Sequence, residues 1–308
     1  MSFNKPFGIM FHHFHNNEHS KGQGSISAND FEKIILHYKD NILSAEDWYK
    51  KAISDQLSED DICLTFDDAL LCQYDVALPI LKKHNLTAFW FVYSSVLQGH
   101  REKLEIYRKF RNEYFSNIDE FYELFFENSL QSEYGNIIIE GLGGYNHSDW
   151  KDFPFYSMSD TKFRFIRDDV LGIDKYNVIM DDVMLSYNVD ENILSKGLWM
   201  SELQVKELAV DGHLIGLHSH THPTSLGSLP FLKQKKEYEL NYDYLKRITG
   251  KDINVMSHPC NSYTEDTLKI LSELGIKLGF RSNMSDNHNS IYEFPREDHM
   301  NIFKGLTL

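Results

Sequence analysis

Four short strand-like segments in this sequence are each followed directly by a histidine or an aspartate. Helix-like segments separate them along the chain, and this alternation is typical of an α/β architecture. If the strands are parallel, the residues after each strand gather on one face, where α/β and barrel enzymes build their sites. The segments are Phe7–Phe11, Ile62–Phe66, His213–Leu217 and Ile253–Ser257. The residues that we expect to converge at their ends are His12, Asp67, Asp68, His218, His222 and His258.

The helix-like segments have identifiable ends. Ser201 is a suitable N-cap for one of them, and glycines at 212, 250 and 275 directly follow three of them, as helix C-termini favour. The pattern predicts helices over residues 69–84, 201–211, 231–249 and 264–274, and further strands at 87–93 and 277–280.

The middle of the chain, residues 96–198, has a different pattern. Apolar and aromatic residues recur at helical spacing from Arg101 to Tyr134, the sequence Gly141–Gly144 predicts a loop, and helical spacing returns at 178–185. We interpret residues 1–95 and 199–308 as two parts of one α/β unit, interrupted by a mostly helical insertion. Its aromatic residues are expected to form a core between helices; the alternative is a lid or a surface for an apolar partner.

The charge balance restricts the possible partners. The chain has 31 Lys and Arg against 46 Asp and Glu, a net charge of −15, which disfavours nucleic acid and anionic lipid as partners. Three cysteines are too few and too scattered for a disulfide framework. No segment has the roughly 20 apolar residues of a transmembrane helix, and the N-terminus lacks the apolar core of a signal peptide. We therefore expect a cytoplasmic protein.

Two histidines in the segment after the third strand have metal-ligand spacing. His218 and His222 are four residues apart, so on a helical turn both rings would face one side and could bind a single cation. The alternative is a polar loop in which the histidines have no shared role.

Two adjacent carboxylates, Asp67 and Asp68, follow the second strand. Like charges so close raise each other's cost of ionisation, and a cation bound to one would relieve the repulsion and leave the other as a base. In extended chain the two side chains would diverge, one toward the metal and one toward the substrate. The alternative is an ordinary acidic helix N-terminus. Metal-assisted hydrolysis needs the groups that would meet here. One carboxylate and two imidazoles would bind the metal, the second carboxylate would act as the base, and a nearby histidine would act as the acid.

These motifs resemble those of a known family. Thr65–Asp68 together with His218–Pro223 is similar to the first two motifs of the polysaccharide deacetylases, the carbohydrate esterase family 4 group with NodB homology, and Ser257–Tyr263 lies where the third motif is found. The resemblance covers about residues 7–95 and 198–300. It implies a distorted seven-stranded (β/α) barrel and removal of an N-acetyl group from a hexosamine.

The resemblance also implies roles for individual residues. Asp68, His218 and His222 match the metal triad, and Asp67 matches the catalytic base. His12 matches the histidine proposed as general acid in one branch of the family, and His13 is the fallback for that role. One divalent metal ion is expected, zinc first, although cobalt, nickel or iron also suits nitrogen and oxygen ligands.

The sequence departs from the family pattern at several positions. Ala69 replaces the usual glycine after the aspartate pair, and the third motif lacks the arginine of many members. Near the C-terminus, Glu293–His299 resembles a Pro-Arg-x-Asp ending of some relatives. Arg296 in this segment is a candidate to orient Asp67 instead, and His299 competes with His12 as the acid. The candidate substrate-binding residues are His13, His258, Pro259, Cys260 and His299.

The sequence thus predicts a metal-dependent carbohydrate deacetylase. A metal-activated water would attack the N-acetyl group of an amino sugar in a glycan or glycan precursor, with Asp67 as the base. One alternative is a deformylase or O-deacetylase acting on a related sugar. Another is a catalytically silent relative that binds a glycan or a protein.

Overall fold

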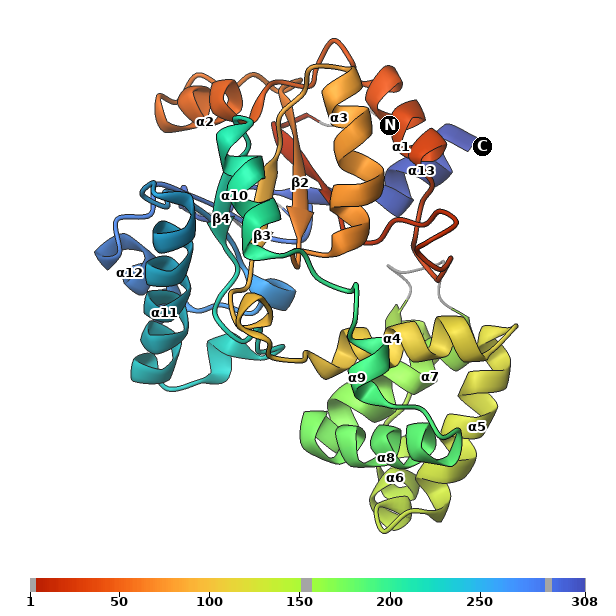
Figure 1. The fold of residues 1–308 in the computed structure, drawn as a ribbon. Helices are drawn as coiled ribbons and strands as arrows, with labels where there is room; N and C mark the ends of the chain where they lie inside the picture. The colour runs from red at the N-terminus through yellow and green to blue at the C-terminus, as the bar shows by residue number, and fades with distance from the viewer. Residues whose placement is uncertain (1–3, 151–156, 286–289, 308) are drawn as a thin grey trace. The chain divides into compact units, whose positions relative to one another are not determined.

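The computed structural model describes residues 4–150, 157–285 and 290–307. It separates into two compact units, one formed by residues 1–100 and 197–308 and the other by residues 101–196. The first unit contains every strand of the described residues, and the second is helical (Figure 1).

The first unit is built on seven parallel strands. In the sheet they follow the order β6-β5-β4-β3-β2-β1-β7. The two outermost strands approach each other, because Phe280 forms a parallel bridge with Phe294, just before β7. This curvature makes a nearly closed barrel and confirms the seven-stranded (β/α) fold that the family resemblance implied. The strands are β1 (Phe7–Phe11), β2 (Ile62–Asp67), β3 (Phe89–Val92), β4 (Leu214–Leu217), β5 (Val255–Ser257), β6 (Leu278–Phe280) and β7 (Arg296–Asp298).

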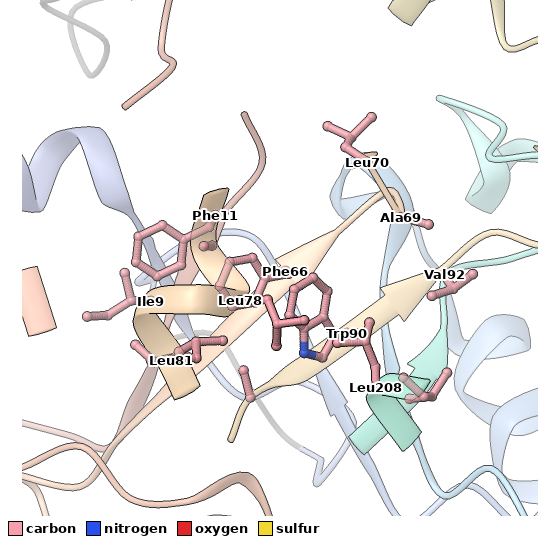
Figure 2. Packing of buried hydrophobic residues seen from close by; sticks show 14 of the residues in the cluster. Ile9, Phe11, Phe66, Ala69, Leu70, Leu78, Leu81, Trp90, Val92 and Leu208 are labelled. Atoms are coloured by element: carbon pink, nitrogen blue, oxygen red, sulfur yellow. The ribbon is translucent and has the colours of Figure 1, made fainter. Parts of the chain in front are cut away.

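Successive side chains of β3 alternate between two different hydrophobic layers, as the twofold period of a strand requires. One layer packs against the surrounding helices; in it Phe66 stacks on Trp90 with ring centroids 4.3 Å apart, next to Leu78 and Leu81 (Figure 2). The other layer surrounds the buried Trp48 and contains Cys63, Phe89, Phe91, Val255, Leu278 and Phe280. Strands β1, β2 and β3 are buried along their whole length, which explains their mostly apolar sequences.

Most helices of this unit begin and end where their sequences predict. Ser201 caps α10 through its side chain, and Gly250 ends α11 in the left-handed conformation. The predicted helix over residues 69–84 is partly wrong: a π-helical turn, Gln73–Ala77, precedes a short α3. Pro79 has no N–H to donate to an α-helical bond, which favours this wider turn. The helices are α1 (Ala28–His37), α2 (Ala45–Ile53), α3 (Leu78–Lys83), α10 (Glu202–Val210), α11 (Phe231–Thr249), α12 (Glu265–Glu273) and α13 (His299–Thr307).

The second unit packs its helices around aromatic side chains. Phe125 and Phe163 lie with ring centroids 4.9 Å apart, and Phe121 and Tyr176 join the same cluster. The loop predicted at 141–144 is partly wrong, because Gly141 lies within a helix, where a Cβ would come within 2.7 Å of Val170. The helices are α4 (Lys103–Tyr114), α5 (Ile118–Gln131), α6 (Gly135–Leu142), α7 (Met158–Phe165), α8 (Gly172–Ser186) and α9 (Glu191–Leu194).

Within the described residues, we find no helix that has both the length and the apolar character needed to span a membrane.

Candidate functional site

The polar residues that follow the strands meet at the carboxyl end of the barrel. Asp67 is the last residue of β2 and Asp68 follows it, while His12 and His218 come directly after β1 and β4. Of the six residues expected to converge there, five lie in mutual contact: His12, Asp67, Asp68, His218 and His222. The contacts described for His258 lie elsewhere.

Three side chains form a compact group of nitrogen and oxygen donors. One donor atom from each of Asp68, His218 and His222 lies within 4.8 Å of the other two. Oδ1 of Asp68 is 3.4 Å from Nε2 of each histidine, yet it is buried and accepts no hydrogen bond. Burial raises the pKa of Asp68, but the neighbouring rings of His222, His218 and His12 outweigh it and hold this pKa well below its usual range.

The donor group fits a divalent metal ion. Nδ1 of His218 is 2.9 Å from the carbonyl oxygen of Ser257 and donates to it, so in the neutral ring Nε2 has the lone pair and faces Asp68. A buried carboxylate oxygen without a donor, facing a nitrogen lone pair, is unfavourable unless a cation lies between them. One carboxylate and two imidazoles suit zinc, and also cobalt, nickel or iron.

The loop after β4 brings the two histidines together in an unexpected way. The helical turn predicted for residues 218–222 is wrong, because this segment is a loop in which Ser219 and His222 have left-handed φ values of 61° and 55°. The carboxylate of Glu237 stabilises the loop by accepting hydrogen bonds from the backbone N–H groups of His220 (3.0 Å) and Thr221 (2.7 Å). The shared orientation of the two rings therefore depends on a residue of α11.

The backbone also turns sharply at the aspartate pair. The extended conformation predicted there is wrong for Asp68, whose φ is 78°, and Ala69 follows with a φ of 53°. Both values lie in the left-handed region, which favours glycine. The glycine that the family usually has at position 69 is thus explained by the backbone, and the alanine is accommodated at a conformational cost.

Asp67 is held by a buried arginine. The guanidinium of Arg296, which is 1% exposed, donates to both carboxylate oxygens of Asp67 at 2.7 and 2.8 Å. It also donates to Oγ of Ser257 at 2.5 Å and to the carbonyl oxygen of Arg281 at 2.8 Å. Burial raises the pKa of Asp67, but Arg296 and then the nearby histidines outweigh it, so that pKa is lowered. Asp67 is therefore a fixed, ionised carboxylate.

His12 is the most exposed of the converging side chains. Its Nε2 lies 3.8 Å from Asp67 Oδ2 and 3.9 Å from Asp68 Oδ2, and its side chain is 28% exposed. A ring that borders both carboxylates and reaches solvent is suited to exchange a proton with a bound substrate. The ring of His13 lies roughly parallel to it, with centroids 6.2 Å apart.

His299 is not placed for the acid role. It is 2% exposed, and its ring nitrogens lie 3.1 and 3.0 Å from the carbonyl oxygens of Met10 and Gly24. Burial lowers its pKa, which disfavours the protonated form that an acid needs. These contacts give no support to His299 as the acid or as a substrate-binding residue, and both roles stay predictions.

The third-motif residues differ in how accessible they are. His258 is 1% exposed, stacks on Tyr263 with ring centroids 4.0 Å apart, and has Nε2 2.9 Å from the carbonyl oxygen of Tyr292. Burial lowers the pKa of His258 to about 3. Pro259 is buried as well, and the substrate-binding roles predicted for both residues stay predictions. Cys260 is exposed, and its predicted role in substrate binding stays a prediction.

The sequence did not single out Asn241, a buried amide that supports the site. It is 0% exposed, accepts a hydrogen bond from the backbone N–H of His218 at 3.0 Å, and donates to the carbonyl oxygen of Val92 at 2.9 Å. The available signal was its spacing, since Asn241 shares the buried face of α11 with Tyr238 and Leu245.

The chain is similar to known proteins both in sequence and in structure. The sequence profile of the family described as Polysaccharide deacetylase matches residues 54–114 and 175–279, which include both aspartates and both triad histidines. A search of curated proteins finds no match.

Solved structures share the fold along nearly the whole chain. A Streptococcus pyogenes deacetylase, PplD, in complex with acetate, aligns with a TM-score of 0.56 and 17% identity over 98% of each chain. The BpsB deacetylase domain from Bordetella bronchiseptica aligns with a TM-score of 0.53 and 15% identity over 95% of this chain and 94% of that one. IcaB from Ammonifex degensii aligns with a TM-score of 0.52 and 15% identity over 96% and 91%. At such identities the likeness concerns the fold.

Proposed function

This chain belongs to the polysaccharide deacetylase family, carbohydrate esterase family 4, and we propose that it removes an N-acetyl group from an amino sugar in a glycan or glycan precursor. One observation carries the proposal. A fixed carboxylate, a three-donor metal group and a partly exposed histidine meet at the end of the barrel, with histidine Nε2 atoms 4.0 Å or less from the carboxylate oxygens. These are the components that hydrolysis of an amide requires.

Asp68, His218 and His222 are the residues that would hold the metal ion. When bound, a divalent metal in this group supplies a polarised water and stabilises negative charge on the acetyl oxygen. The tautomer of His218, fixed by the carbonyl of Ser257, presents Nε2 as a ligand. We propose zinc first, on the basis of the donor set alone.

Asp67 accepts a proton from the attacking water in this proposal. The new bond forms between the water oxygen and the acetyl carbon, and the proton moves to the carboxylate. Arg296 holds both oxygens of that carboxylate, which keeps it ionised and fixes its direction. Arg296 thus acts as a positioning residue.

His12 supplies the proton to the leaving group. As the carbon–nitrogen bond breaks, the amine nitrogen takes a proton from Nε2 of His12, and the products are acetate and a free amino sugar. Its exposed edge is the feature that supports this role over that of any buried histidine of the site.

The experiment measures acetate released from N-acetylglucosamine oligomers, alongside matched N-formyl and O-acetyl substrates. Asp67→Asn should retain the metal and lose about 100-fold or more in kcat, the range that removal of a general base produces. His222→Ala should lose the metal. His220→Ala is the matched control in the same loop, because the His220 ring contacts Ser94 rather than the triad. Full activity of Asp67→Asn would refute the assignment.

The same assay separates the alternatives. Faster release of formate, or of acetate from an ester, would favour the deformylase or O-deacetylase reading. A protein that binds the metal but releases neither acid from any of the substrates would favour a silent binder.

A further inference from the structure

The loop after β1 and the end of β2 are joined by one buried amide side chain. Gln73 is 0% exposed, and its Nε2 group donates to the carbonyl oxygens of His12 at 2.8 Å and Asp67 at 2.6 Å. A primary amide has two N–H donors, so both are used on these two carbonyls. The residues proposed as acid and base are thus connected through a single side chain.

The other end of the same amide is left without a partner. Oε1 of Gln73 is buried and accepts no hydrogen bond, an arrangement that typically costs about 1–3 kcal/mol. The position therefore uses the two donors of the glutamine while its acceptor remains unsatisfied. The preceding residue adds a second connection, because Sγ of Cys72 accepts a hydrogen bond from the backbone N–H of Phe14 at 3.4 Å.

The backbone at Gln73 is unusual as well. Gln73 opens the π-helical turn, and its carbonyl accepts the hydrogen bond from Leu78 N–H that closes this turn. Single π turns within helices are rare and occur frequently at functional sites. The irregular backbone and the bridging amide therefore coincide at one residue.

We propose that Gln73 is a positioning residue that sets the distance between His12 and Asp67 and takes no part in metal binding. The inference rests on the proposed function, in which these residues are the acid and the base. Their facing atoms, Nε2 and Oδ2, are 3.8 Å apart, and a misplacement of about 1 Å lowers the rate about 100-fold. None of the contacts described for Gln73 involves a metal-triad side chain.

The test compares two matched substitutions. Gln73→Met keeps the length of the side chain and removes its N–H donors. Gln234→Met is the control, because Gln234 is 1% exposed and its Nε2 also donates to two carbonyls, those of Gly227 at 3.3 Å and Leu229 at 2.8 Å. The readouts for both variants are kcat, KM, the zinc dissociation constant and the free energy of unfolding.

Both variants should lose stability, and only Gln73→Met should lose turnover. We expect its kcat to fall about 10- to 100-fold, while KM and the zinc dissociation constant stay within about threefold of wild type. A kcat equal to that of Gln234→Met would overturn the inference. If Gln73→Met does not fold, Gln73→Asn serves instead, because it is one methylene shorter and cannot span both carbonyls; unchanged kcat in that variant would also overturn it.

A second readout is independent of activity. The crystal structure of Gln73→Met should show the separation of His12 Nε2 from Asp67 Oδ2 changed by about 1 Å. An unchanged separation contradicts the positioning role. A wild-type protein that releases no acetate refutes the proposed function instead, and the structural comparison still decides the role of Gln73.

Discussion

The buried pair of Arg296 and Asp67 makes a specific prediction about stability. Arg296→Met replaces the guanidinium by an apolar group of similar length and leaves the carboxylate of Asp67, which is 2% exposed, without its two shortest hydrogen bonds. Removing one partner of a buried ion pair typically costs about 3–5 kcal/mol, because the other charge stays buried and unpaired. Folded domains of ordinary stability have about 5–15 kcal/mol in total, so the variant should fold but unfold easily.

The neighbours of Arg296 place the expected cost in the upper part of this range. The guanidinium also donates to Oγ of Ser257 and to the carbonyl oxygen of Arg281, and both acceptors would lose a partner. Without Arg296, only the nearby histidines oppose the effect of burial on Asp67, so its pKa rises. Asp67→Asn should in turn be destabilising, because it leaves a buried arginine. Combining the two substitutions should cost less than the two single costs together, with a coupling of about 3 kcal/mol.

The assay is urea denaturation at neutral pH with linear extrapolation to water. Arg247→Met is the matched control, because Arg247 forms its ion pair with Glu202 at 2.8 Å on the surface, with side chains 58% and 43% exposed. Solvent screens that exposed pair, so it should contribute far less than the buried one. A free energy of unfolding for Arg296→Met no lower than that of Arg247→Met would refute the reasoning.

The remaining predictions concern a buried histidine, a glycine of β4 and the metal group. His213 is 3% exposed, its Nδ1 accepts a hydrogen bond from Ala88 N–H, and burial lowers its pKa from 6.5 to about 4. The neutral ring therefore stabilises the fold fully above pH 6.5, and this contribution of about 3 kcal/mol is lost as pH falls to about 4. Over that pH range the free energy of unfolding of His213→Asn should fall less than that of the wild type. An equal fall would contradict the lowered pKa of His213. Gly216→Ala should lower the free energy of unfolding by about 1–3 kcal/mol, since its Cβ would lie 2.5 Å from Phe91; a variant as stable as wild type would show that the barrel interior adapts. Zinc at 100 times its dissociation constant should stabilise the wild type by about 2.7 kcal/mol and His222→Ala far less, measured as a shift of Tm. Equal Tm shifts in the two proteins would mean that the metal binds at another site.

The sequence predicts the strands and their convergence well, because apolar runs and parallel order are local and topological properties. The helix at Phe231–Thr249 has the predicted bounds, since its apolar spacing and Gly250 are both local signals. Strand β7 was not predicted as a strand, because it has only three residues and all three are charged.

The details of the site depend on contacts between distant residues, which a sequence pattern does not contain. The left-handed φ of Ser219 and His222 is stabilised by Glu237, 15 or more residues later. The amides of Gln73 and Asn241 contact the backbone of candidate site residues from the buried faces of helical segments, where apolar side chains are the expectation. The burial of His299 similarly follows from packing against β1, and the sequence motif alone suggested an exposed role.

The most direct test of the account is acetate release from N-acetylglucosamine oligomers by the purified protein before chelation, after chelation, and after zinc is added back. The account predicts that acetate release stops on chelation and returns with zinc, with one free amine formed for each acetate. Release that continues unchanged in the chelated protein, or no release in any of the three states, would contradict it.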